Sequence, residues 1–316
     1  MPHRVMVLPT GKMELRGLGA ALTQRFQPGT PGCTFETVAR IMATEEPYAG
    51  FTSGGALPIP GPTAKARPAL TLLVRKAISL AEDTSVALVL IVDDLELENR
   101  HQPALVTATV QHHFTQELLE RHHQDPQRLS SLRDALRKKV SFHLAVPMIE
   151  AWLFADPAGP KNAGARAAAL PPALAPGLDP EGLRLQDPAY LADDGAACAC
   201  WQGLSPKKQA EHRPLWLREE ISPRRAEHPK AAMSWLCLDR DERKCSSYKE
   251  TEQGAKALAS LDWSAALACP DHMRFLRALN NDVSLFFNDP GAFSFGQEAP
   301  ETTVKLQDPN RTLRNV

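Results

Sequence analysis

The apolar run from Ser85 to Val92 constrains the fold of this chain more than any other segment. It reads Ser-Val-Ala-Leu-Val-Leu-Ile-Val and is rich in β-branched residues. A strand with one solvent-facing side alternates polar and apolar residues, so a continuous apolar run indicates a strand that is buried on both faces. Such strands are typical of parallel sheets that helices cover on both sides.

Hydrophobic periodicity predicts the rest of an α/β core around this strand. Two more strands are expected at Arg4–Leu8 and Lys139–Val146, and residues 27–66, rich in Gly, Pro and Thr, are expected to form loops with one short element. Amphipathic helices are expected at residues 13–26, 68–82, 103–123 and 128–138. The alternation of strands and helices predicts an α/β fold with a mainly parallel sheet flanked by helices.

Composition divides the chain into three parts. Residues 1–156 contain the alternating strands and helices and form the expected α/β core. From residue 157 the sequence shifts toward Ala, Pro and Gly and then to charged amphipathic segments. Residues 157–286 are therefore expected to form a mostly helical C-terminal lobe, packed on the core or inserted into it. Residues 287–316 are polar and are expected to form a loosely packed tail.

Composition also constrains the cellular compartment and the kinds of partner that we expect for this chain. No apolar run reaches the ~18 residues needed to span a bilayer, and the first residues lack the anatomy of a signal peptide. Six cysteines scattered through 316 residues favour reduced thiols over a disulfide framework. We therefore expect a soluble cytoplasmic protein with no membrane partner. The net charge of −1 shows no basic excess, so any contact with nucleic acid must come from local clusters.

Acidic residues directly follow the buried strand, at Asp93, Asp94, Glu96 and Glu98. In open α/β sheets, ligands bind at the carboxyl ends of the strands. Carboxylates gathered there repel one another unless a proton or a cation intervenes, and their oxygens are the ligands that Mg²⁺ prefers. The cluster therefore predicts a metal site. The alternative is a solvated turn whose acids face water.

Two further groups of charged residues stand out from their surroundings. Glu150 lies in an otherwise apolar stretch from Met148 to Phe154. A buried carboxylate is costly, so this side chain is expected to meet a cation, a metal or hydrogen-bond donors, unless it is an acid favoured by a helix N-terminus. A basic group that includes Arg225 and Lys230 could hold phosphate, and the alternative is a surface cluster.

Several segments, taken in order, resemble a family of TOPRIM-like bacterial proteins of unknown function that often occur in phage-defence or mobile-element loci. They are Thr10-Gly11-Lys12-Met13-Glu14, the strand ending in Asp93-Asp94-Leu95-Glu96, Val146–Asp156, His228-Pro229-Lys230, Tyr248-Lys249-Glu250-Thr251 with Gly254, Leu261-Asp262 and Pro270–Phe275. The resemblance spans most of residues 4–280.

This resemblance implies a TOPRIM-like, Rossmann-like core that binds Mg²⁺, or Mn²⁺ in its place, through acids at strand ends. The catalytic residues would be Glu14, Asp93 and Asp94, the metal ligands Asp93, Asp94, Glu96 and Glu150, and the phosphate-binding residues Arg225 and Lys230. TOPRIM sites cut or rejoin phosphodiester bonds. The implied function is a Mg²⁺-dependent nuclease that acts on nucleic acid as a component of a bacterial antiphage defence system.

One departure from the family pattern motivates a second hypothesis. The family has a glutamate that acts as general acid or base at the position of Thr10, and a threonine cannot take that role at neutral pH. The chain would then be a catalytically degraded binding or sensor subunit that works with a partner such as an ATPase or another defence-system subunit. A third reading is a structural protein whose acids only cap helices. For both the nuclease and the binding-subunit hypotheses, we expect a homo-oligomer or a hetero-complex.

Overall fold

The described part of the chain contains one four-stranded sheet, and all its strands are parallel. The structure is a computed structural model, and it describes residues 3–53, 55–57, 67–166, 178–196, 198–238, 248–308 and 310–316. The predicted α/β class with a parallel sheet is confirmed. The strands are β1 (Arg4–Pro9), β2 (Thr34–Thr37), β3 (Val86–Asp94) and β4 (Val140–Ala145), in the order β2-β1-β3-β4.

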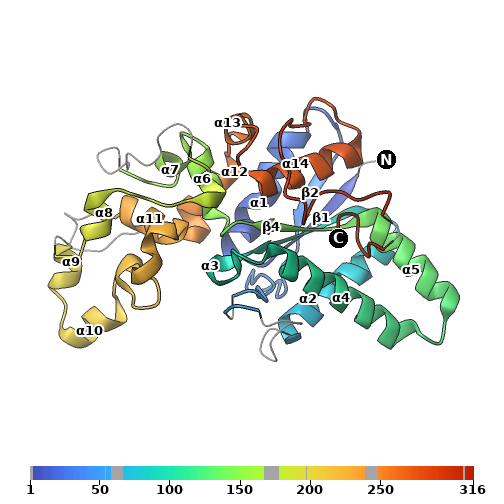
Figure 1. Cartoon of the computed structure of the whole chain (residues 1–316), viewed down its shortest axis with the longest axis horizontal. Helices are drawn as coiled ribbons and strands as arrows, with labels where there is room; N and C mark the ends of the chain where they lie inside the picture. The colour runs from blue at the N-terminus through green and yellow to red at the C-terminus, as the bar shows by residue number, and fades with distance from the viewer. Residues whose placement is uncertain are drawn as a thin grey trace.

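Helices cover both faces of this sheet, as the apolar run predicted (Figure 1). Leu88 and Leu90 of β3 face one hydrophobic cluster, and Val89 and Ile91 face a second cluster on the opposite side. Because successive side chains of a strand point to opposite faces, a strand between two helical layers must be apolar at every position. The first face is covered by α1 (Lys12–Phe26) and α14 (Arg274–Phe287), and the second by α2 (Arg67–Glu82), α4 (Pro103–His122) and α5 (Pro126–Lys139).

Helix α1 lies unusually close to its neighbours because two of its residues have no side chain. A Cβ atom added at Gly17 would lie 2.6 Å from the carbonyl oxygen of Ala255, in α12 (Ala255–Ala259). A Cβ atom added at Gly19 would lie 3.0 Å from the carbonyl oxygen of Phe35 in β2. Glycine destabilises a helix by about 1 kcal/mol relative to alanine, so close packing is favoured over helix propensity at these two positions.

The strand order places a topological switch point between β1 and β3. The chain passes from β1 through α1 to β2 on one side, and from β3 through α4 and α5 to β4 on the other. In open α/β sheets, ligands bind outside the carboxyl ends of the two strands at such a point. Thr10, directly after β1, and Asp93, in the last part of β3, meet at this position through a hydrogen bond.

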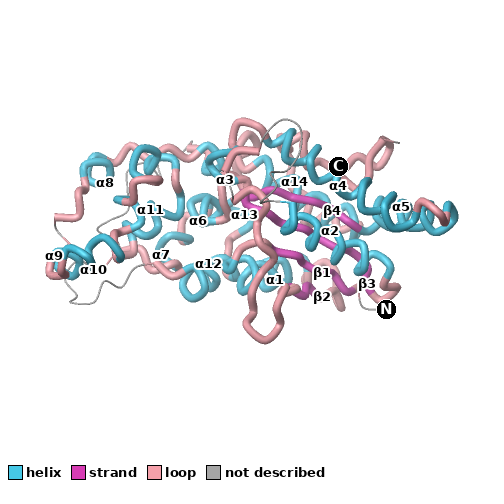
Figure 2. Tube along the Cα trace, turned by 90° about the horizontal axis from the view of Figure 1, so that it is seen from below, coloured by secondary structure: helices cyan, strands magenta, loops and turns pink. Residues whose placement is uncertain are grey.

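A helical lobe stands beyond the carboxyl edge of the sheet, on the side where the one-turn helix α3 (Glu96–Asn99) lies (Figures 1 and 2). The described residues between 157 and 286 are mostly short helices and turns, except that α14 returns to cover the sheet. The further helical elements beyond β4 are α6 (Glu150–Ala155), α7 (Gly159–Asn162), η3 (Pro180–Gly182), α8 (Pro188–Ala192), α9 (Ala199–Gln202), α10 (Pro206–Glu211), η4 (Leu215–Leu217), η5 (Ser222–Glu227), α11 (Pro229–Leu236), the π-type turn η6 (Glu250–Gly254) and α13 (Trp263–Ala266).

A buried ion group joins α14 to β4 and to the last segment of the chain. Arg314 Nη2 lies 2.8 Å from Asp282 Oδ1, and His143 Nε2 lies 3.1 Å from Asp282 Oδ2. Burial by itself raises the pKa of Asp282, but the hydrogen bond to His143 and the charge of Arg314 outweigh it and lower this pKa to about 2. The carboxylate is therefore ionised and ties three segments together.

The expectation of a loosely packed tail after residue 287 is wrong. Leu313 and Asn315 have no exposed surface. The side-chain amide of Asn315 accepts a hydrogen bond from the Phe142 backbone N–H at 3.0 Å and donates one to the Phe142 carbonyl oxygen at 2.7 Å. A polar side chain that suggested a solvated tail instead satisfies backbone groups at the outer edge of β4, where no further strand of the described residues pairs.

Candidate functional site

Six carboxyl groups from separate parts of the chain come together at the carboxyl edge of the sheet, and we call them the carboxylate site. Each of them acts electrostatically on another member of the group or is affected by one, which indicates that they lie in one region. Five of them had been predicted as site residues from the sequence. The members are Glu14 of α1, Asp93 and Asp94 of β3, Glu96 of α3, Glu150 of α6 and Glu250 of η6.

The backbone after β3 holds the acidic segment against β4. The Leu95 N–H donates to the carbonyl oxygen of Ala145 at 2.9 Å, and the Glu96 N–H donates to the carbonyl oxygen of Pro147 at 2.7 Å. Glu96 has a φ of +63°, a left-handed conformation that costs a residue with a side chain roughly 1 kcal/mol. Such strain persists only where the surrounding contacts impose it, and it is concentrated at functional sites.

Asp93 is fully buried and is held by two threonine hydroxyl groups. The Thr10 hydroxyl donates to Asp93 Oδ1, and the Thr52 hydroxyl lies 3.2 Å from Asp93 Oδ2 and 2.6 Å from the carbonyl oxygen of Asp94. A Cβ atom added at Gly50 would lie 3.0 Å from Asp93 Oδ1, so the loop of residues 50–53 approaches this carboxyl closely. Thr10 thus occupies the switch point as a partner of Asp93.

Asp94 connects the end of β3 with the beginning of α6. Its Oδ1 accepts a hydrogen bond from the Ile149 backbone N–H at 2.8 Å. The next residue, Glu150, is 2 % exposed, and its Oε1 lies 3.4 Å from the Tyr248 hydroxyl group. The two acidic segments that stood out in the sequence therefore touch each other through this turn.

Glu14 points into the same region with an unsatisfied oxygen. The residue is 1 % exposed, and its Oε1 has no hydrogen-bond partner. A Cβ atom added at Gly11 would collide with this carboxyl group, so glycine there makes room for it. A buried polar atom without a partner is costly, and it marks a position where a further group can bind.

Burial raises the pKa of several of these carboxyl groups. Together with the charges of Glu150, Glu250 and Asp93, it raises the pKa of Glu14 to about 8. Burial is also the main cause that raises the pKa of Asp93 to about 7 and that of Glu150 to about 7. Asp94 is affected in the same direction, by burial and then by the charge of Glu14. Near neutral pH, these groups therefore bind protons more readily than ordinary carboxyl groups do, and a bound cation would replace those protons.

Of the two predicted phosphate-binding residues, the structure brings only Lys230 into contact with this region. Lys230 of α11 forms an ion pair with Glu250. Burial raises the pKa of Glu150 and of Glu96, and the charge of Lys230 offsets part of that rise. Arg225 is used within the lobe instead. Its guanidinium group donates to the carbonyl oxygens of Leu191 and Asp193 and lies 5.8 Å from the centre of the Tyr190 ring.

The donor set of the carboxylate site suits a hard divalent cation. Carboxylate oxygens are the ligands of Mg²⁺ and Mn²⁺, and the unpartnered Glu14 oxygen offers one more. Among the residues that the structure describes, no three Asp, Glu, His or Cys side chains already converge closely enough to hold a metal ion. Asp93, Asp94 and Glu96 are each held by a protein hydrogen bond, so binding would require some of these side chains to rearrange.

Sequence reasoning missed four residues of the site. Thr10 was read only as a missing acid, whereas it is a hydrogen-bond partner of Asp93. Thr52 lies in a Gly- and Pro-rich loop that carries no periodic signal. Tyr248 and Glu250 were part of the family resemblance but had no role assigned to them. Their proximity to Glu150 and Lys230 depends on tertiary packing that spacing along the chain does not reveal.

Comparisons with protein-family models, curated proteins and solved structures find no match to this chain. The resemblance to TOPRIM-like proteins therefore stays a prediction that rests on the order of motifs. Within the described residues, no helix has both the length and the apolar character needed to cross a membrane.

Proposed function

We propose that this chain is a Mg²⁺-dependent TOPRIM-like nuclease that hydrolyses phosphodiester bonds. The observation that carries the proposal is the gathering of buried carboxyl groups at the switch point of the parallel sheet, with a Glu14 oxygen left unpartnered. So many buried carboxyl groups repel one another when ionised, and a divalent cation offsets that repulsion. A carboxylate-held metal at this edge of an α/β sheet is suited to phosphoryl chemistry.

The residues divide into distinct roles in this proposal. Asp93, Asp94, Glu96 and Glu150 hold the metal, which, when bound, polarises phosphoryl oxygens and lowers the pKa of water. The catalytic carboxyl groups are Glu14, Asp93 and Asp94. The pKa of Glu14, about 8, lets this residue carry a proton near neutral pH, as a general acid must.

The same proposal identifies the groups that meet the substrate. Lys230 contacts the phosphate, because its ammonium group already lies at the site. Arg225 is assigned no phosphate contact in this proposal, because its guanidinium group donates to a backbone carbonyl oxygen within the lobe. The nucleic-acid substrate and the place in a bacterial antiphage defence system are supported by the family resemblance alone.

Cleavage assays with matched variants test this proposal. Purified protein is incubated with plasmid DNA and with RNA in the presence of Mg²⁺, Mn²⁺ or EDTA. We expect cleavage only with metal, and we expect Asp93→Asn to abolish it. Asp134→Asn, which changes an exposed aspartate of α5 in the same way, is expected to leave cleavage intact. Absence of cleavage of any substrate with either metal contradicts the nuclease proposal.

A second candidate is a binding or sensor subunit that works with a partner such as an ATPase. The specific observation in its favour is that Thr10 replaces the family glutamate and is used to hold Asp93. Co-purification with candidate partner proteins, followed by a functional assay of the Asp93→Ala/Asp94→Ala double variant, separates the two. A stable complex whose function survives this double substitution supports the binding role, whereas loss of function without loss of the complex supports catalysis.

A further inference from the structure

Lys230 reaches the carboxylate site from a different part of the fold than most of its acids. Lys230 belongs to α11 in the helical lobe, which stands beyond the carboxyl edge of the sheet (Figure 1). Its ammonium group forms an ion pair with Glu250. Besides Glu250, Glu150 and Asp94 are the acids whose charges act on it most strongly. A positive charge from the lobe is therefore paired with an acid of the lobe and lies within the electrostatic influence of two acids of the core.

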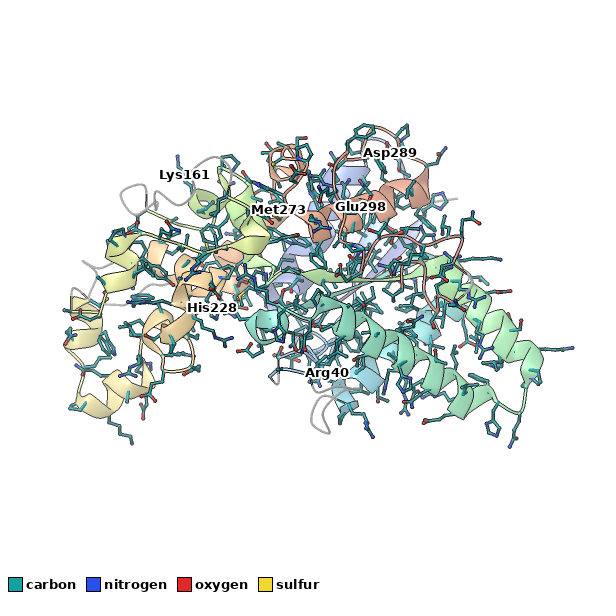
Figure 3. All side chains as sticks on the ribbon, viewed as in Figure 1. Arg40, Lys161, His228, Met273, Asp289 and Glu298 are labelled. Atoms are coloured by element: carbon teal, nitrogen blue, oxygen red, sulfur yellow. The ribbon has the colours of Figure 1, made fainter. Side chains whose placement is uncertain are left out.

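The packing of α11 fixes the backbone from which the Lys230 side chain extends. Residues 231–236 of the helix are all buried, and His228, labelled in Figure 3, caps its first turn by accepting a hydrogen bond from the Ala231 N–H. At the other end, Trp235 Nε1 donates to Asp193 Oδ2 at 2.7 Å. The Lys230 side chain is 33 % exposed, against 58 % for the neighbouring Lys249, whose partner Glu252 belongs to the same surface turn.

The charge that Lys230 supplies is the charge that a metal ion would supply. Glu150 and Asp94 are proposed metal ligands, and a cation that binds both must lie where the field of Lys230 now acts. Two like charges in a partly buried site repel each other strongly, because water screens them little there. The unpartnered Oε1 of Glu14, which is almost fully buried, shows that one cation of this kind leaves part of the site unsatisfied.

We propose that the Lys230 ammonium group occupies the cation position of the carboxylate site in the metal-free protein, and that a divalent ion binds by displacing it. This inference rests on the proposed metal site, and it adds a regulatory role for the lobe. Because Lys230 is carried by α11, metal binding changes the electrostatic interaction of the lobe with Glu150 and Asp94 of the core. The displaced ammonium group stays at the rim of the site, where a phosphate can meet it.

Calorimetric titrations with Mg²⁺ and with Mn²⁺ test the displacement. We compare the wild-type protein with Lys230→Met, Lys230→Gln and the matched surface control Lys249→Met. If Lys230 competes with the ion, its removal is expected to lower the dissociation constant by about tenfold or more, since a unit charge at close range in a partly buried site is worth at least that much. Lys230→Arg keeps the charge, so we expect it to bind no more tightly than the wild type. Lys249→Met is expected to bind as the wild type does.

A second measurement uses only the wild-type protein and so does not depend on the folding of a variant. An amine-acylating reagent is applied with and without saturating ion, and the modification of each lysine is read by peptide mass spectrometry. Displacement predicts that Lys230 is acylated faster when the ion is bound, whereas acylation of Lys249 is unchanged. Acylation of Lys230 that is equal or slower with the ion overturns the proposal.

The outcomes separate this inference from the nuclease proposal on which it rests. Ion binding that is equally tight or weaker in both Lys230→Met and Lys230→Gln overturns the displacement but leaves the metal site in place. Tighter binding in these variants, without cleavage of any nucleic acid by the wild type, supports the displacement and contradicts the nuclease. Absence of ion binding by every protein overturns both.

Discussion

Replacing Glu14 by glutamine is expected to stabilise the protein, and to do so only at neutral and alkaline pH. The wild-type carboxyl group is buried and has an oxygen without a partner. Glutamine keeps the size and shape of this side chain but cannot ionise. The substitution therefore isolates the cost of placing a negative charge at this position of the carboxylate site.

The size of the effect follows from the pKa shift. Burial, followed by the charges of Glu150, Glu250 and Asp93, raises the pKa of Glu14 from 4.5 to about 8. Since one pKa unit corresponds to about 1.4 kcal/mol, full ionisation of Glu14 costs the folded state on the order of 5 kcal/mol. Below the unfolded pKa, both states hold the proton and the cost is absent. It grows as the pH rises from 4.5 to about 8 and is constant above that value.

Urea denaturation followed by tryptophan fluorescence, in EDTA and at several values from about pH 5 to pH 9, measures this difference. The gain in unfolding free energy for Glu14→Gln is expected to be small at the acid end and several kcal/mol at the alkaline end. Saturating Mg²⁺ is expected to stabilise the wild type and so to reduce the difference in unfolding free energy between it and Glu14→Gln. Glu120→Gln, at an exposed position of α4, is the matched control and is expected to show no such trend. A gain that does not change with pH would refute the assignment of a buried, proton-holding carboxyl group.

Three further predictions concern the fold around the site. Gly17→Ala is expected to destabilise the protein by about 2 kcal/mol or more in chemical denaturation, because the new Cβ atom would lie 2.6 Å from the Ala255 carbonyl oxygen. Unchanged stability would show that α1 can move away from Ala255. Thr10→Val is expected to lower the free energy of unfolding by about 1–3 kcal/mol, because it removes the hydroxyl group that donates to Asp93. Thr10→Ser keeps a hydroxyl group and is expected to restore most of that stability. Asn315→Ala is expected to lower stability by about 1–3 kcal/mol and to increase self-association in light scattering, and a monodisperse variant of wild-type stability would contradict the role of Asn315 at the edge of β4.

The position of the site could be predicted from the sequence because it depends on one strand. An apolar run that ends in two aspartates places those acids at the carboxyl edge of a parallel sheet, whatever the other elements do. The strand observed at Val86–Asp94 confirms this part of the argument. The burial of Glu150 was likewise foreseen from its apolar neighbours.

The partners of these acids could not be predicted, because they depend on how distant segments pack. Lys230 and Arg225 are five positions apart in the chain, yet a kink at Arg224 and the start of α11 at Pro229 send their side chains to different places. The pattern of residues along the chain cannot tell which of these two side chains lies at the carboxylate site. The last residues of the chain were misjudged for a related reason, since a polar side chain such as that of Asn315 can be fully buried when it pairs with backbone groups.

The segment that contains Asn315 also limits how this protein can assemble. It engages the Val140 carbonyl oxygen and both backbone groups of Phe142, so a strand from another molecule cannot pair there without first expelling it. The opposite edge of the sheet is β2, which is only four residues long and therefore a poor template for strand addition. A continuous sheet running through two copies is thus disfavoured at both ends. Any oligomer or complex that this chain forms is expected to be built from its helices or its lobe.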